Sequence, residues 1–238
     1  MSKEAFIRRL FDTITPQYDL FNRVASLGLD QGWRRRTVDS LQLLQGMTVL
    51  DLASGTGDLA AEEARRLVPL GKVVACDLSR PMLVSASRKL GCRPLESWHL
   101  VYAQGAGEAL PFSASRFDSV TIGFALRNVS DLDQVFRELA RVLRPGGRVA
   151  LLEFGRPRNR FLRLGQWLWL TCVIPPLGLL ATGKLWPFLY LRRSILQFIS
   201  PEEVVRRMQA AGLAGSQFRP LHGGVVVLYT AQRDHPHE

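Results

Sequence analysis

Short apolar runs of strand length recur along the first two thirds of the chain, separated by stretches with helical periodicity. The runs are Met47 to Ala53, Lys72 to Leu78, Trp98 to Gln104, Phe117 to Ala125 and Arg148 to Phe154. Strands that are buried on both faces read as continuous apolar runs, and strands that alternate with helices form parallel sheets covered on both sides. The pattern predicts an α/β fold with a mostly parallel sheet.

Polar residues, proline and glycine predict where two of the helices begin and end. Apolar positions at helical spacing predict a helix from Ser130 to Leu143, with Ser130 as N-cap and residues 145–147, Pro-Gly-Gly, as its stop. Residues 200–203 form a capping box with proline at the first helical position, and this second helix is expected to end near Gly212. Helices therefore continue to the last part of the chain.

The C-terminal part predicts two more strands. The runs 217–221 and 225–229 are strand-like and are hinged at Gly223 and Gly224, which is typical of an antiparallel pair. The tail 233–238 is polar and is expected to be loose. The sheet should thus end in an antiparallel addition.

One segment does not fit a plain α/β domain. Between Gly165 and Gly183 there is no charged residue, and arginines flank both sides. About 20 apolar residues span a bilayer, so the length permits a transmembrane helix, but Pro175 and Pro176 remove backbone donors in its middle. We expect two shorter apolar helices joined at the prolines, which form a pocket wall that also touches a bilayer. The alternatives, in order, are that the segment is plain core packing and that it is a true transmembrane span.

The most informative stretch is the glycine turn that follows the first apolar run. Gly55 and Gly57 permit backbone conformations closed to other residues and let a nucleotide approach the main chain. Asp77 ends the next apolar run, where a carboxylate can accept hydrogen bonds from both hydroxyls of a ribose. These residues predict a nucleoside site.

Charge selects the nucleoside. With Ala60, the turn also satisfies the pattern of NAD enzymes, which would place a pyrophosphate at the helix N-terminus. Asp58 on the first helical turn and Asp51 at the strand end would repel a phosphate and attract a cation. S-adenosylmethionine carries a sulfonium and an ammonium group and no phosphate, so it is the favoured cofactor. As the alternative, Asp58 merely caps its helix.

Composition and charge add a compartment and a class of partner. The 238 residues carry a formal net charge of +10, which implies either attraction to nucleic acid or anionic lipid or simply an arginine-rich solvated face. Cys76, Cys92 and Cys172 are too widely spaced for a disulfide framework or a metal knuckle, so a reducing compartment and no metal are expected. Residues 1–12 are charged and amphipathic, unlike a signal peptide, and predict an intracellular protein.

Several blocks, in order and spacing, carry a resemblance that covers nearly all of the chain. They are parts of residues 11–34, the run 117–129, the segments 143–147 and 152–154, and residues 223–226. Through them the chain resembles the C-methyltransferases of ubiquinone and menaquinone biosynthesis, above all the demethylmenaquinone methyltransferases. The resemblance implies a Rossmann-like class I methyltransferase fold, with a mostly parallel seven-stranded sheet and a C-terminal antiparallel strand pair.

We therefore expect a single methyltransferase domain, residues 1–238, built in four parts. These are an N-terminal helical cap (1–45), a core that binds S-adenosylmethionine (46–155), an apolar insertion that faces substrate or membrane (156–200) and a C-terminal helix with strands (201–232).

Cofactor contacts follow from the resemblance by position. Thr56 in the glycine turn and Asp77 at the ribose correspond directly, Ala106 and Gly107 fall at the adenine, and Gly123 follows the fourth strand. The family usually has Asp or Asn at 106 and often a serine at 123. Because the side chain of Ala106 cannot accept a hydrogen bond, we expect looser adenine contacts made by the backbone.

The implied reaction is methylation of a ring carbon of a reduced quinone with a polyprenyl tail. We predict that Arg127 stabilises the developing phenolate, that Asn128 orients it and that Tyr18 contacts the ring. A salt bridge from Arg127 to an acid such as Asp131, and a packing role for Tyr18, are the alternatives. His222 titrates in the range that suits a base, but a lone histidine near a turn is more often incidental.

The expected partners are the polyprenyl hydroquinone and an anionic membrane, touched peripherally from the cytoplasmic side by the apolar segment and its arginines. Nucleic acid is not expected, and an oligomer is left open. Alternatives are a methyltransferase for a ubiquinone or phylloquinone precursor or another small lipid, a basic RNA-binding methyltransferase-like protein, and the NAD enzyme considered above.

Overall fold

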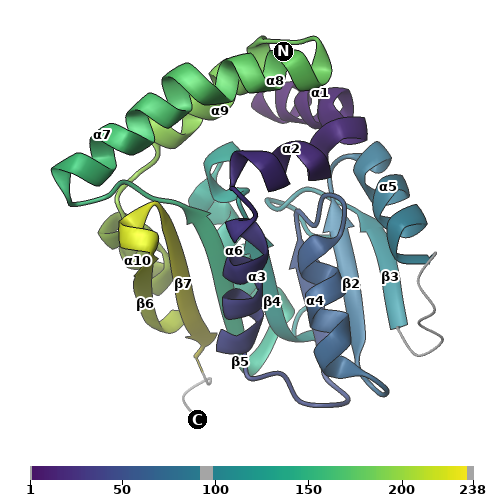
Figure 1. Cartoon of the computed structure of the whole chain (residues 1–238). Coiled ribbons are helices and arrows are strands. Elements are labelled where there is room, and N and C mark those ends of the chain that lie inside the picture. The colour runs from purple at the N-terminus through teal and green to yellow at the C-terminus, as the bar shows by residue number, and fades with distance from the viewer. Residues whose placement is uncertain (1, 92–98, 235–238) are drawn as a thin grey trace.

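A computed structural model describes residues 2–91 and 99–234. It contains one seven-stranded sheet in the order β3-β2-β1-β4-β5-β7-β6 (Figure 1). Strands β1 to β5 pair in parallel, and β7 is antiparallel to both β5 and β6, which confirms the predicted sheet. The strands are β1 (Thr48–Leu52), β2 (Lys72–Asp77), β3 (His99–Gln104), β4 (Phe117–Gly123), β5 (Leu143–Phe154), β6 (Leu213–Leu221) and β7 (Val226–Arg233).

Helices cover both faces of the sheet and also its upper edge. In Figure 1, α3, α4 and α5 lie on one face, α6 and α10 on the other, and α1, α2, α7, α8 and α9 lie across the top as a roof. Their bounds are α1 (Lys3–Ile14), α2 (Tyr18–Ala25), α3 (Leu29–Ser40), α4 (Asp58–Leu67), α5 (Arg80–Gly91), α6 (Leu132–Val142), α7 (Arg160–Leu168), α8 (Ile174–Thr182), α9 (Trp186–Gln197) and α10 (Pro201–Ala210).

The main core lies between the sheet and the helices α6 and α10. The apolar stripe of α6, including Val135, Phe136 and Leu139, is fully buried there against strand residues such as Val120 and Leu151. Burial of such side chains contributes roughly 1.5 to 3 kcal/mol each before the entropy cost of ordering them. The core thus holds the sheet rigid below the roof, where the strands β1 to β5 end.

Two boundaries around α6 differ from the sequence expectation. The N-cap is Asp131, whose carboxylate accepts from the amide of Gln134, and not Ser130. The helix ends at Val142 as expected, but strand β5 begins directly at Leu143, which pairs with Phe117 ahead of the irregular segment 144–147. The Pro-Gly-Gly segment is therefore a bulge within the strand and not a loop before it.

One further strand boundary differs from the expectation, and three expectations concern residues that the structure does not describe. Strand β6 begins at Leu213 and not at residue 217, because a bulge at Gly215, with φ +60°, lets the strand pair with β7 over a longer stretch. The predicted strand start at Trp98, Cys92 and the tail 235–238 lie outside the described residues.

The apolar segment forms one continuous helical run and not two helices joined at the prolines. The run Arg160–Thr182 passes from α7 through a five-residue π turn, η3 (Trp169–Val173), into α8. Pro175 and Pro176 occupy the first turn of α8, where a missing amide hydrogen costs least.

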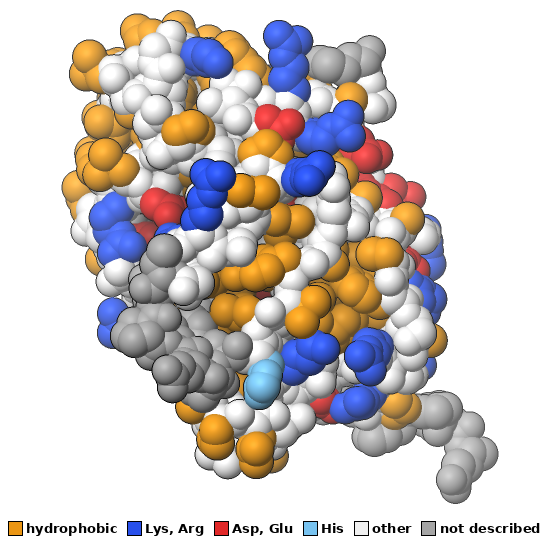
Figure 2. All heavy atoms as spheres, turned by 90° about the vertical axis from the view of Figure 1, so that its right-hand side faces the viewer, with side chains coloured by type: hydrophobic (Ala, Val, Ile, Leu, Met, Phe, Trp, Pro, Cys, Tyr) orange, Lys and Arg blue, Asp and Glu red, His pale blue; other side chains and the backbone are white. Residues whose placement is uncertain are grey.

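By length and composition, this run is the one helix among the described residues that could cross a membrane, and 22% of its apolar window is buried. It lies along the roof in Figure 1. Figure 2 shows hydrophobic side chains gathered along the upper rim of the face near α5 and β3, with Lys and Arg side chains among and below them. The segment is therefore an exposed apolar surface and not a core helix.

Candidate active site

The glycine turn joins β1 to α4 at the upper edge of the sheet. Gly57 has φ +81°, and a Cβ atom on it would lie 2.9 Å from Cδ1 of Leu90 in α5. Gly55 has φ +55°, and its amide donates to Oδ2 of Asp77 over 2.8 Å. Both positions need glycine because both have a positive φ, which other residues rarely adopt. In addition, a side chain on Gly57 would collide with Leu90, and the backbone of Gly55 must come close to Asp77.

Asp77 stands at the end of β2 and faces the turn. Its Oδ1 accepts from the amide of Ser79 over 2.8 Å, and the hydroxyl of Ser79 donates to Asp12 of α1 over 2.6 Å. Burial raises the pKa of Asp77, and the two backbone donors offset part of that rise. Each carboxylate oxygen keeps a second lone pair, so Asp77 can still accept from a ligand.

A cavity opens above these residues, between the strand ends and α1. The predicted residues Gly55, Asp77, Ala106, Gly107 and Gly123 all line it, as does Tyr18 from the roof. Among the described residues, Asp51, Thr56 and Gly57 are not part of its lining. The other lining residues are Glu4, Ile7, Arg8, Phe11, Leu52, Ala53, Leu78, Ser79, Met82, Gly105, Glu108, Ile122, Phe124, Ala125, Asn128, Val129, Ser130 and Val135.

Asp51 is buried below the turn and is not exposed to the cavity. Its Oδ2 accepts from the amide of Ala60 over 3.0 Å, and its Oδ1 lies 3.2 Å from the hydroxyl of Thr121. The same hydroxyl lies 2.6 Å from Oε1 of Glu63. Burial raises the pKa of Asp51 to about 7 and that of Glu63 well above its ordinary value. Asp51 therefore anchors α4 and does not offer a charge to a ligand.

Asp58 also serves the chain itself. Lys89 of α5 pairs with Asp58 over 2.8 Å and with Asp19 of α2 over 2.8 Å, and the hydroxyl of Thr56 donates to Asp19. Burial would raise the pKa of Asp58, but the charges of Arg34 and Lys89 outweigh it and lower that pKa. Asp58 is thus already paired with two of the chain's own cations, and its expected attraction for a cationic ligand stays a prediction.

The polar cluster of Asp19, Thr56, Lys89 and Asp58 has a clear structural effect. It joins α2 of the roof to the glycine turn, α4 and α5, and so holds the roof over the cavity lined by Gly55 and Asp77, which we call the cofactor-side cavity. Thr56 acts here through its hydroxyl on Asp19.

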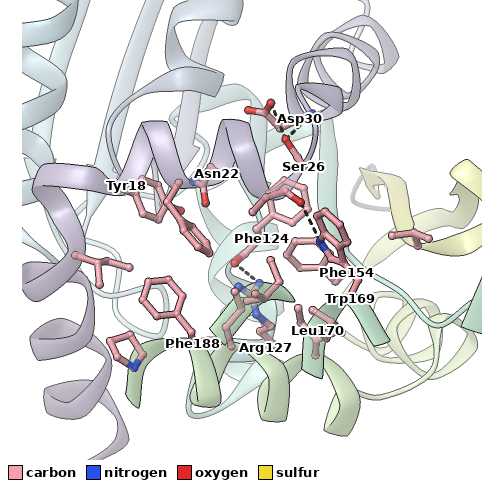
Figure 3. A pocket seen from close by; sticks show the side chains of 18 of the residues that line it. Tyr18, Asn22, Ser26, Asp30, Phe124, Arg127, Phe154, Trp169, Leu170 and Phe188 are labelled. Atoms are coloured by element: carbon pink, nitrogen blue, oxygen red, sulfur yellow. Dashed lines mark hydrogen bonds between the residues drawn. The ribbon is translucent and has the colours of Figure 1, made fainter. Parts of the chain in front are cut away.

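A second cavity of about 270 Å³ lies beside the first, under the roof helices. This volume is close to the lower end of the range typical of small-molecule sites, roughly 300 to 1,000 Å³. Figure 3 shows side chains from α2, the end of β4 and the roof helices pointing into the same space. Its walls are largely apolar and include Phe21, Leu170, Ile174, Phe188 and Ile195.

The two cavities meet at four residues that line both. Phe11 and Tyr18 come from the N-terminal helices, and Phe124 and Asn128 follow β4. The ring of Tyr18 packs edge-on against Phe11, and its Cε1 is 3.8 Å from where a Cβ of Gly55 would stand. Tyr18 thus both packs and faces the junction, so its two expected roles are compatible.

Arg127 lines the apolar cavity at the start of this junction. Its Nη1 pairs with Oε1 of Glu153 over 2.7 Å, with side-chain exposures of 7% and 0%, and its guanidinium lies over the ring of Phe154 at 5.2 Å. The expected salt bridge to Asp131 is replaced by this one to Glu153. The Nε of Arg127 is buried and has no hydrogen-bond partner among residues 2–91 and 99–234.

Asn128 is the last residue of the short helix η2 (Leu126–Asn128) and is buried. Its Oδ1 lies 3.3 Å from the hydroxyl of Tyr190 in α9. Its Nδ2 is a second buried donor without a partner in the described part of the chain. Two adjacent residues that line the apolar cavity thus each carry a buried N–H group without a partner in the described part of the chain.

His222 lines the apolar cavity, but it is not free to act as a base. Its Nδ1 accepts from Nε1 of Trp33 over 2.7 Å. A neutral imidazole with Nδ1 as acceptor carries its proton on Nε2, so neither nitrogen has a free lone pair. The candidate base is therefore corrected to a structural acceptor for the indole.

The sequence did not reveal the partners of the predicted residues. Glu153 follows an apolar run at the carboxyl edge of the sheet, and that position alone could have suggested a role. Tyr190 and Lys89 carry no such signal, because each lies on a helix remote in sequence from its partner.

The cofactor-side cavity fits S-adenosylmethionine. Asp77 can accept from ribose hydroxyls, and Gly107 and Gly123 line the cavity without side chains. A Cβ on Gly107 would lie 3.3 Å from Val135 and one on Gly123 would lie 2.6 Å from Leu59, so packing within the chain also favours glycine at both positions. Ala106 offers no side-chain acceptor to adenine. No described group of three or more His, Cys, Asp or Glu residues is placed to hold a metal ion.

Comparison with known proteins decides the family. The model of the ubiE/COQ5 methyltransferase family matches residues 1–233. The chain belongs to the ubiE/COQ5 methyltransferase family. A ubiquinone/menaquinone biosynthesis C-methyltransferase UbiE of Hahella chejuensis is 37% identical over 96% of this chain and 91% of that protein. A demethylmenaquinone methyltransferase of Desulfitobacterium hafniense is 33% identical over 97% of this chain and 91% of that protein.

Solved structures show that this ubiE/COQ5 family member has the fold of S-adenosylmethionine-dependent methyltransferases. An enzyme of that class from Aquifex aeolicus has a TM-score of 0.61 at 18% identity, over 84% of this chain and 88% of that one. The [4+2]-cyclase SpnF has a TM-score of 0.66 at 15% identity, over 96% and 95%. Because a cyclase shares the fold, the fold alone does not fix the chemistry. The family assignment makes this chain an S-adenosylmethionine-dependent methyltransferase.

Proposed function

We propose that this chain methylates a ring carbon of a reduced quinone with a polyprenyl tail, with demethylmenaquinol as substrate and menaquinol as product. The observation that carries the proposal is that Arg127 and Asn128, adjacent residues in the lining of the apolar cavity, each hold a buried N–H donor, Nε and Nδ2, for which the described residues offer no partner. A buried N–H without a partner costs about 1 to 3 kcal/mol. A phenolate oxygen of a hydroquinone could accept from both, which would satisfy the two donors and supports a role for them in binding the substrate.

On the cofactor side, the chain's task is to hold and cover its ligand. Asp77 would accept from the ribose, backbone groups of residues 105–107 would hold the adenine, and Tyr18 with Phe11 would close the cavity from above. S-adenosylmethionine, when bound, supplies an electrophilic methyl group, and its sulfur takes the electron pair of the broken bond. The roof keeps water away from that reaction.

On the substrate side, Arg127 and Asn128 stabilise the ring oxygen as it loses its proton. The charge that develops on this oxygen makes the neighbouring ring carbon electron-rich, and that carbon forms the new bond to the methyl group. The carbon then loses its hydrogen as a proton and the ring oxygen takes a proton back, so the net reaction releases one proton. Glu153 already balances the charge of Arg127. The contribution of Arg127 to the reaction is therefore the hydrogen bond from its Nε to the ring oxygen, and not its net charge.

The walls of the apolar cavity suit an aromatic bicyclic ring. Phe124 and Phe154 pack with ring centroids 4.7 Å apart, and Trp33 meets Phe124 edge-on at 6.1 Å. Stacked and edge-on arrangements of this kind are the ones that aromatic rings prefer. The apolar residues of α8 and α9 extend the lining away from the junction, where a tail would lie.

Peripheral contact with an anionic membrane on the cytoplasmic side is the second part of the proposal. Phe161 and Leu180 on the roof are 85% and 86% exposed, and arginines follow the same segment at positions 160, 163, 192 and 193. An exposed apolar strip with basic neighbours is typical of helices that lie in a bilayer interface. Such contact would give an insoluble substrate a direct route to the cavity.

The first test supplies labelled methyl donor with a panel of reduced quinones: demethylmenaquinols of several tail lengths, a ubiquinone precursor and a phylloquinone precursor. We expect a product one methyl group heavier from the demethylmenaquinols. Failure to methylate any of these, with S-adenosylhomocysteine still bound, would overturn the quinone assignment and leave the methyltransferase class intact.

The membrane part has its own test. Sedimentation with phosphatidylglycerol vesicles should capture the protein, and L180D should weaken the capture. L44D is the matched control, because Leu44 is 65% exposed but lies in the loop between α3 and β1, away from the roof. Equal loss in both variants, or capture by neutral vesicles alone, would contradict an oriented contact.

Methylation of a ubiquinone precursor is the second candidate, since the two relatives above carry different quinones in their names. The ratio of kcat/KM for the two substrates in the panel decides between them.

A further inference from the structure

Helix α9 of the roof rests directly on η2, the short helix that carries Arg127 and Asn128. The contact is made by Tyr190, whose ring lines the apolar cavity and whose hydroxyl lies 3.3 Å from Oδ1 of Asn128. This inference rests on the proposed function, in which Nδ2 of Asn128 binds the substrate oxygen.

An asparagine amide has two nearly isosteric orientations, and they offer opposite chemistry to a ligand. With Oδ1 toward the junction, Asn128 would repel a phenolate, and with Nδ2 toward it, Asn128 would bind one. Burial raises the pKa of the Tyr190 phenol, which therefore stays protonated and donates. In the structure the hydroxyl donates to Oδ1 of Asn128, which leaves Nδ2 as the donor on the other side of the amide.

The tyrosine is itself held in place. Its ring packs edge-on against Phe6 of α1 with centroids 5.1 Å apart, and Phe6 packs against Trp186 at 5.6 Å. Two helices of the roof thus fix the hydroxyl, and replacement of Tyr190 by phenylalanine would keep these ring contacts.

We infer that Tyr190 is a positioning residue, which holds the Asn128 amide with its N–H group toward the substrate. Its hydroxyl acts on the reaction only through Asn128. The position of α9, a helix of the apolar roof, thereby determines how the amide of Asn128 is oriented toward the substrate ring.

A double-mutant cycle tests this inference with four proteins: the native chain, Y190F, N128A and the double variant. We expect N128A to lower kcat roughly 100-fold, as loss of one oxyanion donor does. Y190F should lower kcat about 3- to 10-fold, because one hydrogen bond that holds the amide is lost. In the double variant, Y190F should add nothing to N128A, since its only route of action is gone.

Two readouts separate positioning from a general structural role. Y190F should leave the affinity for S-adenosylhomocysteine and the midpoint of thermal unfolding unchanged, whereas a packing defect would shift the midpoint. Y102F is the matched control: Tyr102 on β3 is also part-buried, lies outside both cavities and should retain full kcat.

Each outcome decides. Non-additive losses in the cycle support the inference. Native kcat in Y190F, or losses that multiply in the double variant, would overturn it while N128A still supports the proposed function. Native kcat in N128A would overturn both the donor role of Asn128 and, with it, the role of Tyr190.

Discussion

Replacement of Arg127 by lysine isolates the hydrogen bond that the proposed mechanism needs. Lysine keeps a positive charge for Glu153, which lies 2.7 Å from the guanidinium and is fully buried, but it has no counterpart of Nε. Alanine would be a poorer choice, because it would leave the Glu153 carboxylate buried without its cation, at a cost of about 3 to 5 kcal/mol. R127K therefore changes the donor set while it limits the damage to the fold.

The magnitude follows from the environment of the donor. Nε is buried, has no partner among the described residues and belongs, with Nδ2 of Asn128, to two adjacent residues that line the apolar cavity. Loss of one donor from an oxyanion site costs about 2.7 to 4 kcal/mol in the transition state, which corresponds to roughly a 100- to 1,000-fold decrease in kcat. The affinity for S-adenosylhomocysteine should change little, because Arg127 lines the apolar cavity and not the cofactor-side one.

Initial rates at saturating quinol and methyl donor measure this effect, with calorimetric binding of S-adenosylhomocysteine alongside. R141K is the control: Arg141 also pairs with a glutamate, Glu138, at 2.6 Å, but it lines neither cavity. A folded R127K protein that keeps more than a third of the native kcat would refute the role of Nε.

Three further changes test the cofactor side and the buried acids. D77N should weaken S-adenosylhomocysteine binding about 10- to 100-fold in calorimetry, because a carboxylate is the stronger acceptor; unchanged affinity would remove Asp77 from the ribose site. K89M should lower both that affinity and the stability, the latter by about 1 kcal/mol for part-exposed pairs. Because the charges of Arg34 and Lys89 lower the pKa of Asp58, the stability difference should shrink only as the pH falls below the ordinary Asp pKa of 3.8 and through that lowered pKa. Equal affinity in K89M would mean that the cluster around Lys89 is not needed to hold the roof over the cavity. Urea unfolding should show stability falling between about pH 4 and pH 7, because the folded state keeps a proton on Asp51 up to about pH 7 while the unfolded state loses it near 3.8. E63Q, with one buried acid fewer, should flatten this slope, and an unchanged slope would contradict the charge repulsion between Asp51 and Glu63.

Local pattern was enough for most of the fold. Each strand run and each cap depends on residues a few positions apart, so apolar runs and the capping box at 200–203 could be placed without knowledge of the rest. Errors arose where two distant segments compete for the same backbone. Residues 143–147 look like a loop, but pairing of Leu143 with Phe117 extends the strand through them.

The charges around the glycine turn show the same division. The argument from Asp51 and Asp58 assumed that both acids face a ligand. In the fold, Lys89 and Arg34 reach Asp58 from two other helices, and Thr121 with Glu63 surrounds Asp51. The chosen cofactor nevertheless agrees with the family, because the family blocks implied S-adenosylmethionine independently of these two acids.

The sequence by itself determined the class of protein: the strand and helix order, the nucleoside turn, the ribose acid and the family blocks are all written in neighbouring residues. Only the tertiary structure decided which charges are satisfied within the chain and which donors stay unpaired. Glu153 holds Arg127 across 26 residues, and Tyr190 reaches Asn128 across 62. Burial and partnership at such separations depend on how the whole chain packs, and local pattern does not contain that information.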